Sequence, residues 1–199
     1  MKRILSSAPA SLTLGLIISA LLLFVWMFDQ SVDGLGFTSF VLRWLHVLGA
    51  IVWVGMIFFV NFIQLAAVEQ ADDSGRRTLL KLVVPRVASA FRHAAHLTVL
   101  TGILLLGATG YLLDQWVFMS AVYIAPLRSL LLWAGALAGL AMWAFVQFII
   151  WPNLKVVLDE HADAAAKAEA RIRVRNFARI NLILALPVTL VMVAAAHLY

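Results

Sequence analysis

Residues 40–64 read FVLRWLHVLGAIVWVGMIFFVNFIQ, an apolar run whose single formal charge is Arg43. An α-helix needs about 20 predominantly apolar residues to cross a hydrocarbon core about 30 Å thick. This run is long enough, and similar runs occupy residues 11–28, 94–113, 123–151 and 176–198. The sequence therefore predicts an all-α integral membrane protein, with about five transmembrane helices in a single bundle over residues 1–199.

The composition excludes the common soluble classes. The 199 residues are 64% hydrophobic and 13% charged, whereas soluble domains average about 45–50% apolar and about 25% charged residues. The net charge of +5 indicates contact with anionic lipid head groups rather than nucleic acid. Cysteine is absent, which excludes disulfides, thiolate-ligated clusters, covalently attached c-type haem and cysteine nucleophiles.

Basic residues predict how the chain crosses the membrane. They precede the first run at Lys2 and Arg3, and they gather in residues 76–92 and 155–179, on alternate connections. The positive-inside rule then places the N-terminus in the cytoplasm and Tyr199 in the periplasm of a bacterial inner membrane.

Two segments need separate interpretation. The first run follows a basic start like that of a signal peptide, but residues 29–33 lack a small-x-small cleavage pattern, so we expect a retained helix. The connection after the fourth run is rich in alanine and in both signs of charge. It predicts a cytoplasmic amphipathic helix at about residues 155–172.

Histidines are the strongest candidates for chemistry. His46, Gly49, Trp53 and Gln64 fall within about 60° of one direction on a helix, with Asn61 at the edge of that stripe. An imidazole beside the small Gly49 could ligate a metal or haem iron; the alternative is a histidine hydrogen-bonded to a neighbouring helix.

His197 lies near the outer end of the fifth run, in the leaflet predicted for His46. Two histidines on different helices at similar depth are what axial ligation of haem b requires. The alternative for His197 is an interfacial residue at the end of the chain.

His93 and His96 share a helix face at a spacing of three residues. They could bind a small metal ion with a third ligand such as His161, or belong to a basic interfacial patch. No catalytic motif with recognisable spacing occurs.

Four ordered motifs carry a resemblance: residues 42–62; Pro85-Arg86 with Phe91-Arg92, Thr98 and Thr101-Gly102; Ile149-Ile150-Trp151-Pro152-Asn153; and Arg179-Ile180-Asn181 with Pro187, Met192 and residues 194–197. Together they resemble the membrane domain of the cytochrome c-linked, membrane-bound urate oxidase family. More distantly, His46 and Trp53-x-Gly55 are similar to copper-resistance membrane proteins and membrane protoporphyrinogen oxidases.

The resemblance implies a haem- or metal-dependent membrane oxidase that sends electrons outward. His46 and His197 match histidines of the family's motifs, with Trp53 and Gly49 shaping the pocket, whereas His93 and His96 gain no support. The family's usual form continues into further helices and a cytochrome c domain. That domain is not present in this sequence, so the expected acceptor is a separate cytochrome c or a quinone.

Three functions follow as hypotheses. The first is a haem b-binding membrane redox protein. The second is a non-catalytic accessory subunit of a respiratory or oxidase complex. The expected protein partners are the other subunits of such a complex or further copies of this chain. The third is a copper-handling protein, which the lack of soft sulfur ligands disfavours. The polar residues that could contact a urate-like substrate are Arg43, Asn61, Gln64 and Arg179.

Overall fold

The computed structural model describes residues 6–28, 33–112 and 126–198, and every regular element among them is a helix. The chain divides into two compact units, Met1–Val41 and Leu42–Tyr199. Lys2, Arg3, Tyr199 and the connection expected between the third and fourth runs lie outside the described residues. The two units are therefore treated separately.

The first unit contains helix α2 (Ala8–Met27) and the first residues of α3 (Gly34–Phe58). Ser7 caps α2 because its hydroxyl accepts a hydrogen bond from the Ala10 amide at 3.4 Å. The Trp26 and Phe40 rings meet edge to face with centroids 5.9 Å apart. The expected first span, residues 11–28, corresponds to α2.

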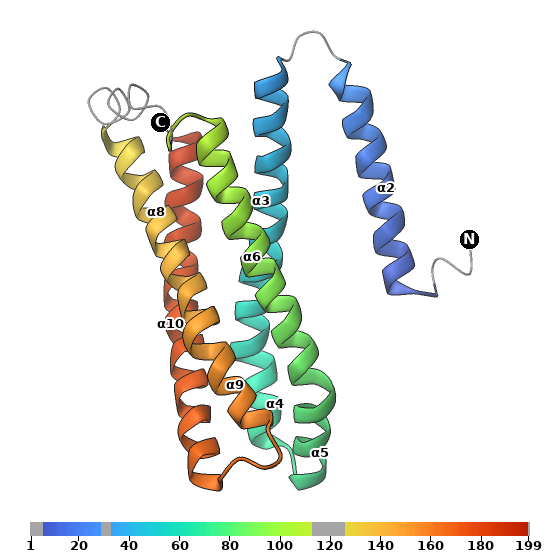
Figure 1. Ribbon diagram of the computed structural model, residues 1–199, viewed down its shortest axis with the longest axis vertical. Helices are drawn as coiled ribbons and strands as arrows, with labels where there is room; N and C mark the ends of the chain where they lie inside the picture. The colour runs from blue at the N-terminus through green and yellow to red at the C-terminus, as the bar shows by residue number, and fades with distance from the viewer. Residues whose placement is uncertain (1–5, 29–32, 113–125, 199) are drawn as a thin grey trace. The chain divides into compact units, whose positions relative to one another are not determined.

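The second unit is a helical bundle in which the chain runs down, up, down and up again (Figure 1). The elements form four nearly continuous rods. The first rod is α3, η1 (Phe59–Gln64) and α4 (Leu65–Gln70); the second is α5 (Asp73–Thr78), η2 (Leu79–Val83) and α6 (Val84–Ala108); the third is α8 (Pro126–Ala144), η3 (Phe145–Ile150) and α9 (Trp151–Leu158); the fourth is α10 (Ala164–His197).

Three of these rods contain a π-helical segment, namely η1, η2 and η3. π-helices are rare, and they often occur at functional sites. Nothing in the hydropathy pattern of the sequence marks these three segments in advance.

The helix expected at residues 155–172 is interrupted in the structure. Helix α9 ends at Leu158, and α10 begins at Ala164 and continues as the fifth span. Two aspartates account for the break: the Asp159 carboxylate accepts from the His161 amide at 2.9 Å, and Asp163 caps α10 by accepting from Ala165 N at 2.9 Å.

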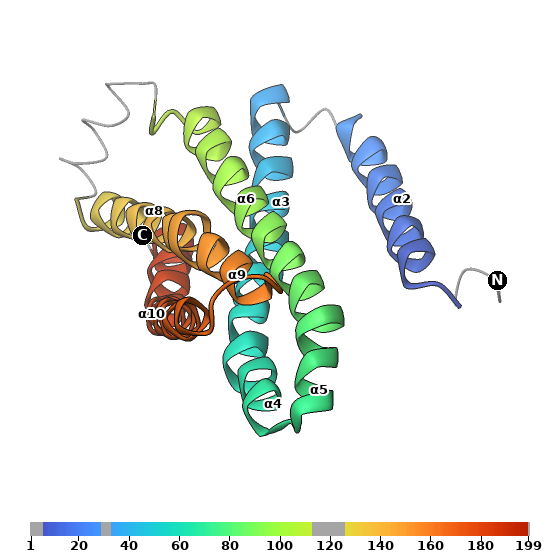
Figure 2. The same ribbon diagram turned by 60° about the horizontal axis from the view of Figure 1, so that its bottom comes forward.

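Small residues allow the helices to approach closely. Gly49 of α3 lies against Thr98 of α6, and Gly135 of α8 lies against Val191 and Met192 of α10. Close packing at small residues is typical of helices in lipid. Figure 2 shows α3 crossing α6 on one side, while α8 and α10 run together on the other.

The buried core lies at mid-height, where all four rods meet. Its members are Trp53, Ile57, Phe91, Ala94, Ala95, Met142, Val146 and Ala185. The end formed by the α4–α5 and α9–α10 turns carries Arg76, Arg77, Arg171 and Arg173, and we call it the basic end.

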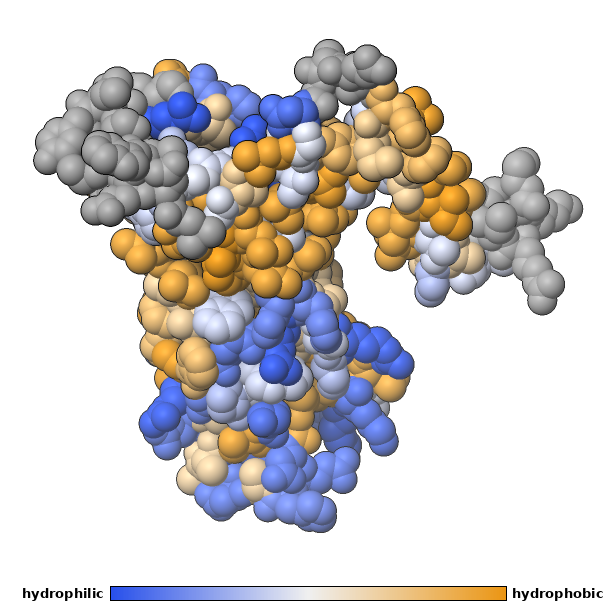
Figure 3. Space-filling model, turned by 45° about the horizontal axis from the view of Figure 1, so that its top comes forward, coloured by the Kyte–Doolittle hydropathy of each residue, from blue (hydrophilic) through white to orange (hydrophobic). Residues whose placement is uncertain are grey.

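Five described helical stretches are long and apolar enough to cross a membrane: Ala8–Met27, Gly34–Gln70, Asp73–Ala108, Leu127–Leu158 and Ala164–His197. On the face of the bundle seen in Figure 3, hydrophobic residues form a band and hydrophilic residues cover the basic end. The expected all-α fold class is confirmed, and the five apolar helices are candidate spans of a multi-pass membrane protein. Its orientation across the membrane stays a prediction.

Candidate functional site

The imidazole of His46 is fixed by the neighbouring helix. Its Nδ1 lies 2.8 Å from the carbonyl oxygen of Thr98 in α6. A carbonyl oxygen can only accept, so Nδ1 carries the proton and the Nε2 lone pair is left free. The bond joins α3 to α6 through Nδ1, and the ligating role of Nε2 stays a prediction.

The His46 ring packs against Gly102 of α6. A Cβ at this position would lie 3.0 Å from His46 Cε1 and 3.1 Å from its Nδ1, so a larger residue would displace the ring. The Thr101 hydroxyl donates to the same Thr98 carbonyl oxygen, at 3.2 Å. The Thr98 carbonyl oxygen therefore accepts from both His46 Nδ1 and the Thr101 hydroxyl.

Gly49 and Trp53 have different surroundings from His46. Gly49 is buried at the crossing of α3 and α6, where a Cβ would lie 2.7 Å from Thr98 Oγ1. Trp53, about one turn beyond Gly49 along α3, is only 4% exposed and belongs to the buried core. Its Nε1 is buried and has no hydrogen-bond partner in the part of the chain that the structure describes.

His197 is the last residue of α10 and is exposed. Asn61 of η1 donates to Ala178 O of α10 at 3.2 Å, and the two rods are antiparallel, so the level of His46 corresponds to about residue 193. His197 therefore lies about one turn, or about 6 Å, further along the axis. No hydrogen bond or ring contact joins the two histidines, both of which lie in described segments.

His93 and His96 are exposed, and each Nδ1 donates to a carbonyl of its own helix, Ser89 O and Arg92 O, both at 2.7 Å. Within residues 6–28, 33–112 and 126–198 no group of three or more histidine or acidic side chains could hold a metal ion. The expected three-ligand site with His161 is therefore not assembled.

Gln147 of η3 connects the third and second rods. Its Oε1 accepts from Arg92 Nε at 2.9 Å, and its Nε2 lies 3.3 Å from His96 Nδ1. The Arg92 guanidinium also stacks over the Trp151 ring, 4.7 Å from its centroid. The cluster gives Arg92 two partners within an apolar span, Gln147 Oε1 and the Trp151 ring. The Gln147 NH₂ and the His96 Nδ1–H, which already donates to Arg92 O, are both donors and form no hydrogen bond with each other.

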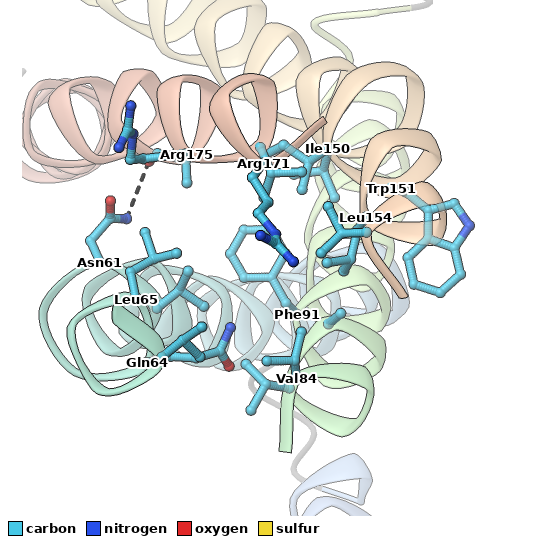
Figure 4. Close-up of a pocket in the computed structure, with 18 of the residues that line it drawn as sticks. Asn61, Gln64, Leu65, Val84, Phe91, Ile150, Trp151, Leu154, Arg171 and Arg175 are labelled. Atoms are coloured by element: carbon cyan, nitrogen blue, oxygen red, sulfur yellow. Dashed lines mark hydrogen bonds between the residues drawn. The ribbon is translucent and has the colours of Figure 1, made fainter. Parts of the chain in front are cut away.

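A cavity of about 250 Å³ lies on the basic side of the core, and Figure 4 shows 18 of its lining residues. It is lined by residues of α3, the three π-helical segments, α4, α6, α9 and α10, and its walls are predominantly apolar. We call it the π-lined cavity. Its polar and charged lining residues are Asn61, Gln64, Glu69, Arg92, Arg171 and Arg175.

The cavity contains two of the four residues expected to contact a substrate. Asn61 and Gln64 line it, and each has a buried side-chain oxygen without a hydrogen-bond partner among the described residues. Arg43 and Arg179 are exposed and do not line it. The structure therefore brings Asn61 and Gln64 together and leaves the two arginines apart.

Sequence reasoning missed Arg171 and Arg175 as cavity residues. They belong to the basic run used to predict topology, and the position of the α9–α10 turn determines which of its arginines line the cavity. A turn assigned at Asp159–Asp163 would have provided that signal.

The sequence and the fold match no family model, no characterised protein and no solved structure at a significant level. The resemblance to the urate oxidase family therefore rests on the quoted motifs alone.

Proposed function

We propose that this chain is a haem b-binding membrane redox protein with His46 as an axial ligand. The observation that supports the proposal is the 2.8 Å hydrogen bond from His46 Nδ1 to Thr98 O. Histidines that bind metals through one ring nitrogen commonly donate the other N–H to a carbonyl, which fixes the tautomer and the ring orientation. His46 has this arrangement.

The surroundings of His46 fit an iron ligand. The side chain is half-buried in an apolar span, and Gly102 lets the ring lie flat against α6. A haem b group at Nε2 would supply a centre that accepts and releases one electron. The residues of this chain would hold it, orient the imidazole and keep water from it.

His197 is the proposed second ligand. Along the axis of the bundle His197 lies about one helical turn beyond His46. Both residues lie in the half of the bundle away from the basic end. With the basic end in the cytoplasm, as the positive-inside rule predicts, both histidines would lie in the periplasmic half of a bacterial inner membrane. Electrons would then leave towards a separate periplasmic cytochrome c or a quinone.

The test is the visible absorption of detergent-purified protein, oxidised and dithionite-reduced, with a pyridine haemochrome assay for stoichiometry. We expect a Soret band and sharp reduced α and β bands from the unaltered chain. His46→Asn keeps a donor for Thr98 O but removes the ligating nitrogen, so it should abolish haem binding. His161→Ala, on the exposed α9–α10 turn, is the matched control and should retain full haem content.

Two results would refute parts of the proposal. A colourless protein after expression with ample haem, or full haem content in His46→Asn, would refute His46 ligation. An unchanged reduced spectrum in His197→Ala would remove His197 as the second ligand while leaving His46 in place.

A further inference from the structure

The π-lined cavity has a hydrophobic interior built from separate helices. Val84 and Phe91 of α6, Val146 of η3, and Leu154 and Val157 of α9 are all buried and all line it. An apolar pocket with a few polar groups is the usual form of a binding site for small molecules. Its interior suits a hydrocarbon chain.

All three π-helical segments contribute to this one cavity. Asn61 and Gln64 come from η1, Leu80 from η2, and Val146 and Ile150 from η3. A π-helical turn is uncommon and tends to occur where a helix serves a function. Because three such turns meet at this cavity, it is the part of the bundle that we expect to bind a ligand.

The exposed lining residues indicate where the cavity opens. Glu69 belongs to α4, and Arg171 and Ile172 belong to the first turns of α10. The entrance is therefore between α4 and α10, towards the basic end. In Figure 4 the Arg171 side chain extends from α10 into the space above Phe91, and the Gln64 amide points towards the same space from the opposite helix.

Arg171 and Arg175 line the cavity without an ion pair in the described segments, although Glu69 lies at the same entrance. Among the described residues the ion pairs are Arg76–Asp73 and Arg173–Glu169, so Arg171 has no carboxylate partner, Glu69 included. Arg175 also lines the cavity, and its buried Nε has no hydrogen-bond partner in the described segments. Arginine is well suited to bind a carboxylate through two parallel hydrogen bonds.

The size of the cavity limits its occupant. Sites for drug-sized ligands and cofactors measure about 300–1,000 Å³, and this cavity, at about 250 Å³, is just below that range. This size is compatible with one hydrocarbon chain and a small head group.

From these features we propose that the π-lined cavity binds a single-chain anionic amphiphile, specifically a long-chain fatty acid. The carboxylate pairs with Arg171, and the Gln64 amide donates to it after turning its NH₂ inward. The chain lies against Val84, Phe91 and Leu154. This site is separate from the His46 region and does not depend on haem binding.

The experiment is equilibrium binding of radiolabelled palmitate to the delipidated full-length protein in a non-ionic detergent. We expect saturable binding of one palmitate per chain, with 1-hexadecanol at least tenfold weaker because it lacks the charge. Arg171→Gln should weaken palmitate binding by about tenfold or more, since a charged hydrogen bond is lost. Arg173→Gln is the matched control, because Arg173 is exposed, pairs with Glu169 and does not line the cavity, and it should change binding less than twofold.

A second variant tests the position of the chain. Ala88→Phe places a ring in the cavity from α6, and it should prevent binding while the thermal melting curve confirms that the protein is folded. The proposal is overturned if palmitate does not bind saturably, if hexadecanol binds equally well, or if Arg171→Gln and Arg173→Gln behave alike. Competition by a short two-chain phosphatidylglycerol as strong as that by unlabelled palmitate would overturn the assignment to a single chain.

Discussion

Replacing Gly49 by alanine tests the crossing of α3 and α6. A Cβ at this position would lie 2.7 Å from Thr98 Oγ1 and 3.2 Å from the Thr98 backbone nitrogen. The first distance is about 0.7 Å short of the 3.4 Å at which ordinary contact begins. The Thr98 hydroxyl cannot simply turn away, because it donates to Ala94 O at 2.9 Å, so the helices must separate.

The magnitude follows from comparison with a second glycine on the same helix. Gly55→Ala meets nothing within 4 Å, so it should keep the helix-propensity gain of about 0.5–1 kcal/mol. Gly49→Ala has the same gain minus an overpacking cost of about 1–3 kcal/mol. The difference between the two variants should therefore be about 1–3 kcal/mol, or about 2–12 °C in melting temperature for a chain of this size.

The assay is tryptophan fluorescence during a thermal ramp in one detergent, with Trp53 in the buried core as a reporter. Gly49→Ala should melt below Gly55→Ala. If Gly49→Ala melts at or above Gly55→Ala, the close approach of α3 and α6 is wrong, and the His46 bond to Thr98 that depends on it loses its support.

Three further predictions concern single contacts. Gly102→Ala should lower the haem content while changing the melting temperature little, because the new Cβ would lie 3.0 Å from the His46 ring. Equal haem content in the variant and the parent protein would refute this. Asn181 is fully buried and donates to Met142 O, so Asn181→Asp should lower the melting temperature strongly by burying an unpaired charge, at a cost of about 3–5 kcal/mol, and a melting curve like that of the parent would contradict it. Glu169→Ala should lower the free energy of unfolding by at most about 0.5 kcal/mol, because the ion pair between Glu169 and Arg173 is exposed. For a chain of this size that corresponds to at most about 2 °C in melting temperature, and a larger decrease would show that the pair stabilises the fold more than an exposed pair should.

The sequence was sufficient for the helical spans but not for their ends. Hydropathy detects only the part of a helix that needs lipid, so residues 40–64 were assigned where the helical stretch is Gly34–Gln70, and 94–113 where it is Asp73–Ala108. The helix over residues 73–93 continues because its arginines and Lys81 are good helix formers, whereas propensity does not explain the extension over residues 34–39, which contains two glycines. The α9–α10 turn was missed because an alanine-rich run outweighed two aspartates that act as turn and cap.

The His46 environment was partly predictable. Its position on the Gly49 side of the helix predicted contact with a neighbouring helix, and the bond to Thr98 confirms this. The π-lined cavity was not predictable, because it depends on three π-helical segments that leave no hydropathy signal. Asn61 and Gln64 were selected as polar residues in an apolar span, whereas Arg171 resembled any other arginine of a basic run.

The three π-helical segments also affect how the chain tolerates deletions. A π-helical turn is an α-helix with one residue inserted. Removing a residue elsewhere in a span turns everything beyond it by about 100° and exposes the wrong face. Removing one residue from η1, η2 or η3 would instead restore a plain α-helix with the flanking faces in register. A single-codon deletion in one of these segments would therefore reshape the cavity wall while sparing the register of the bundle.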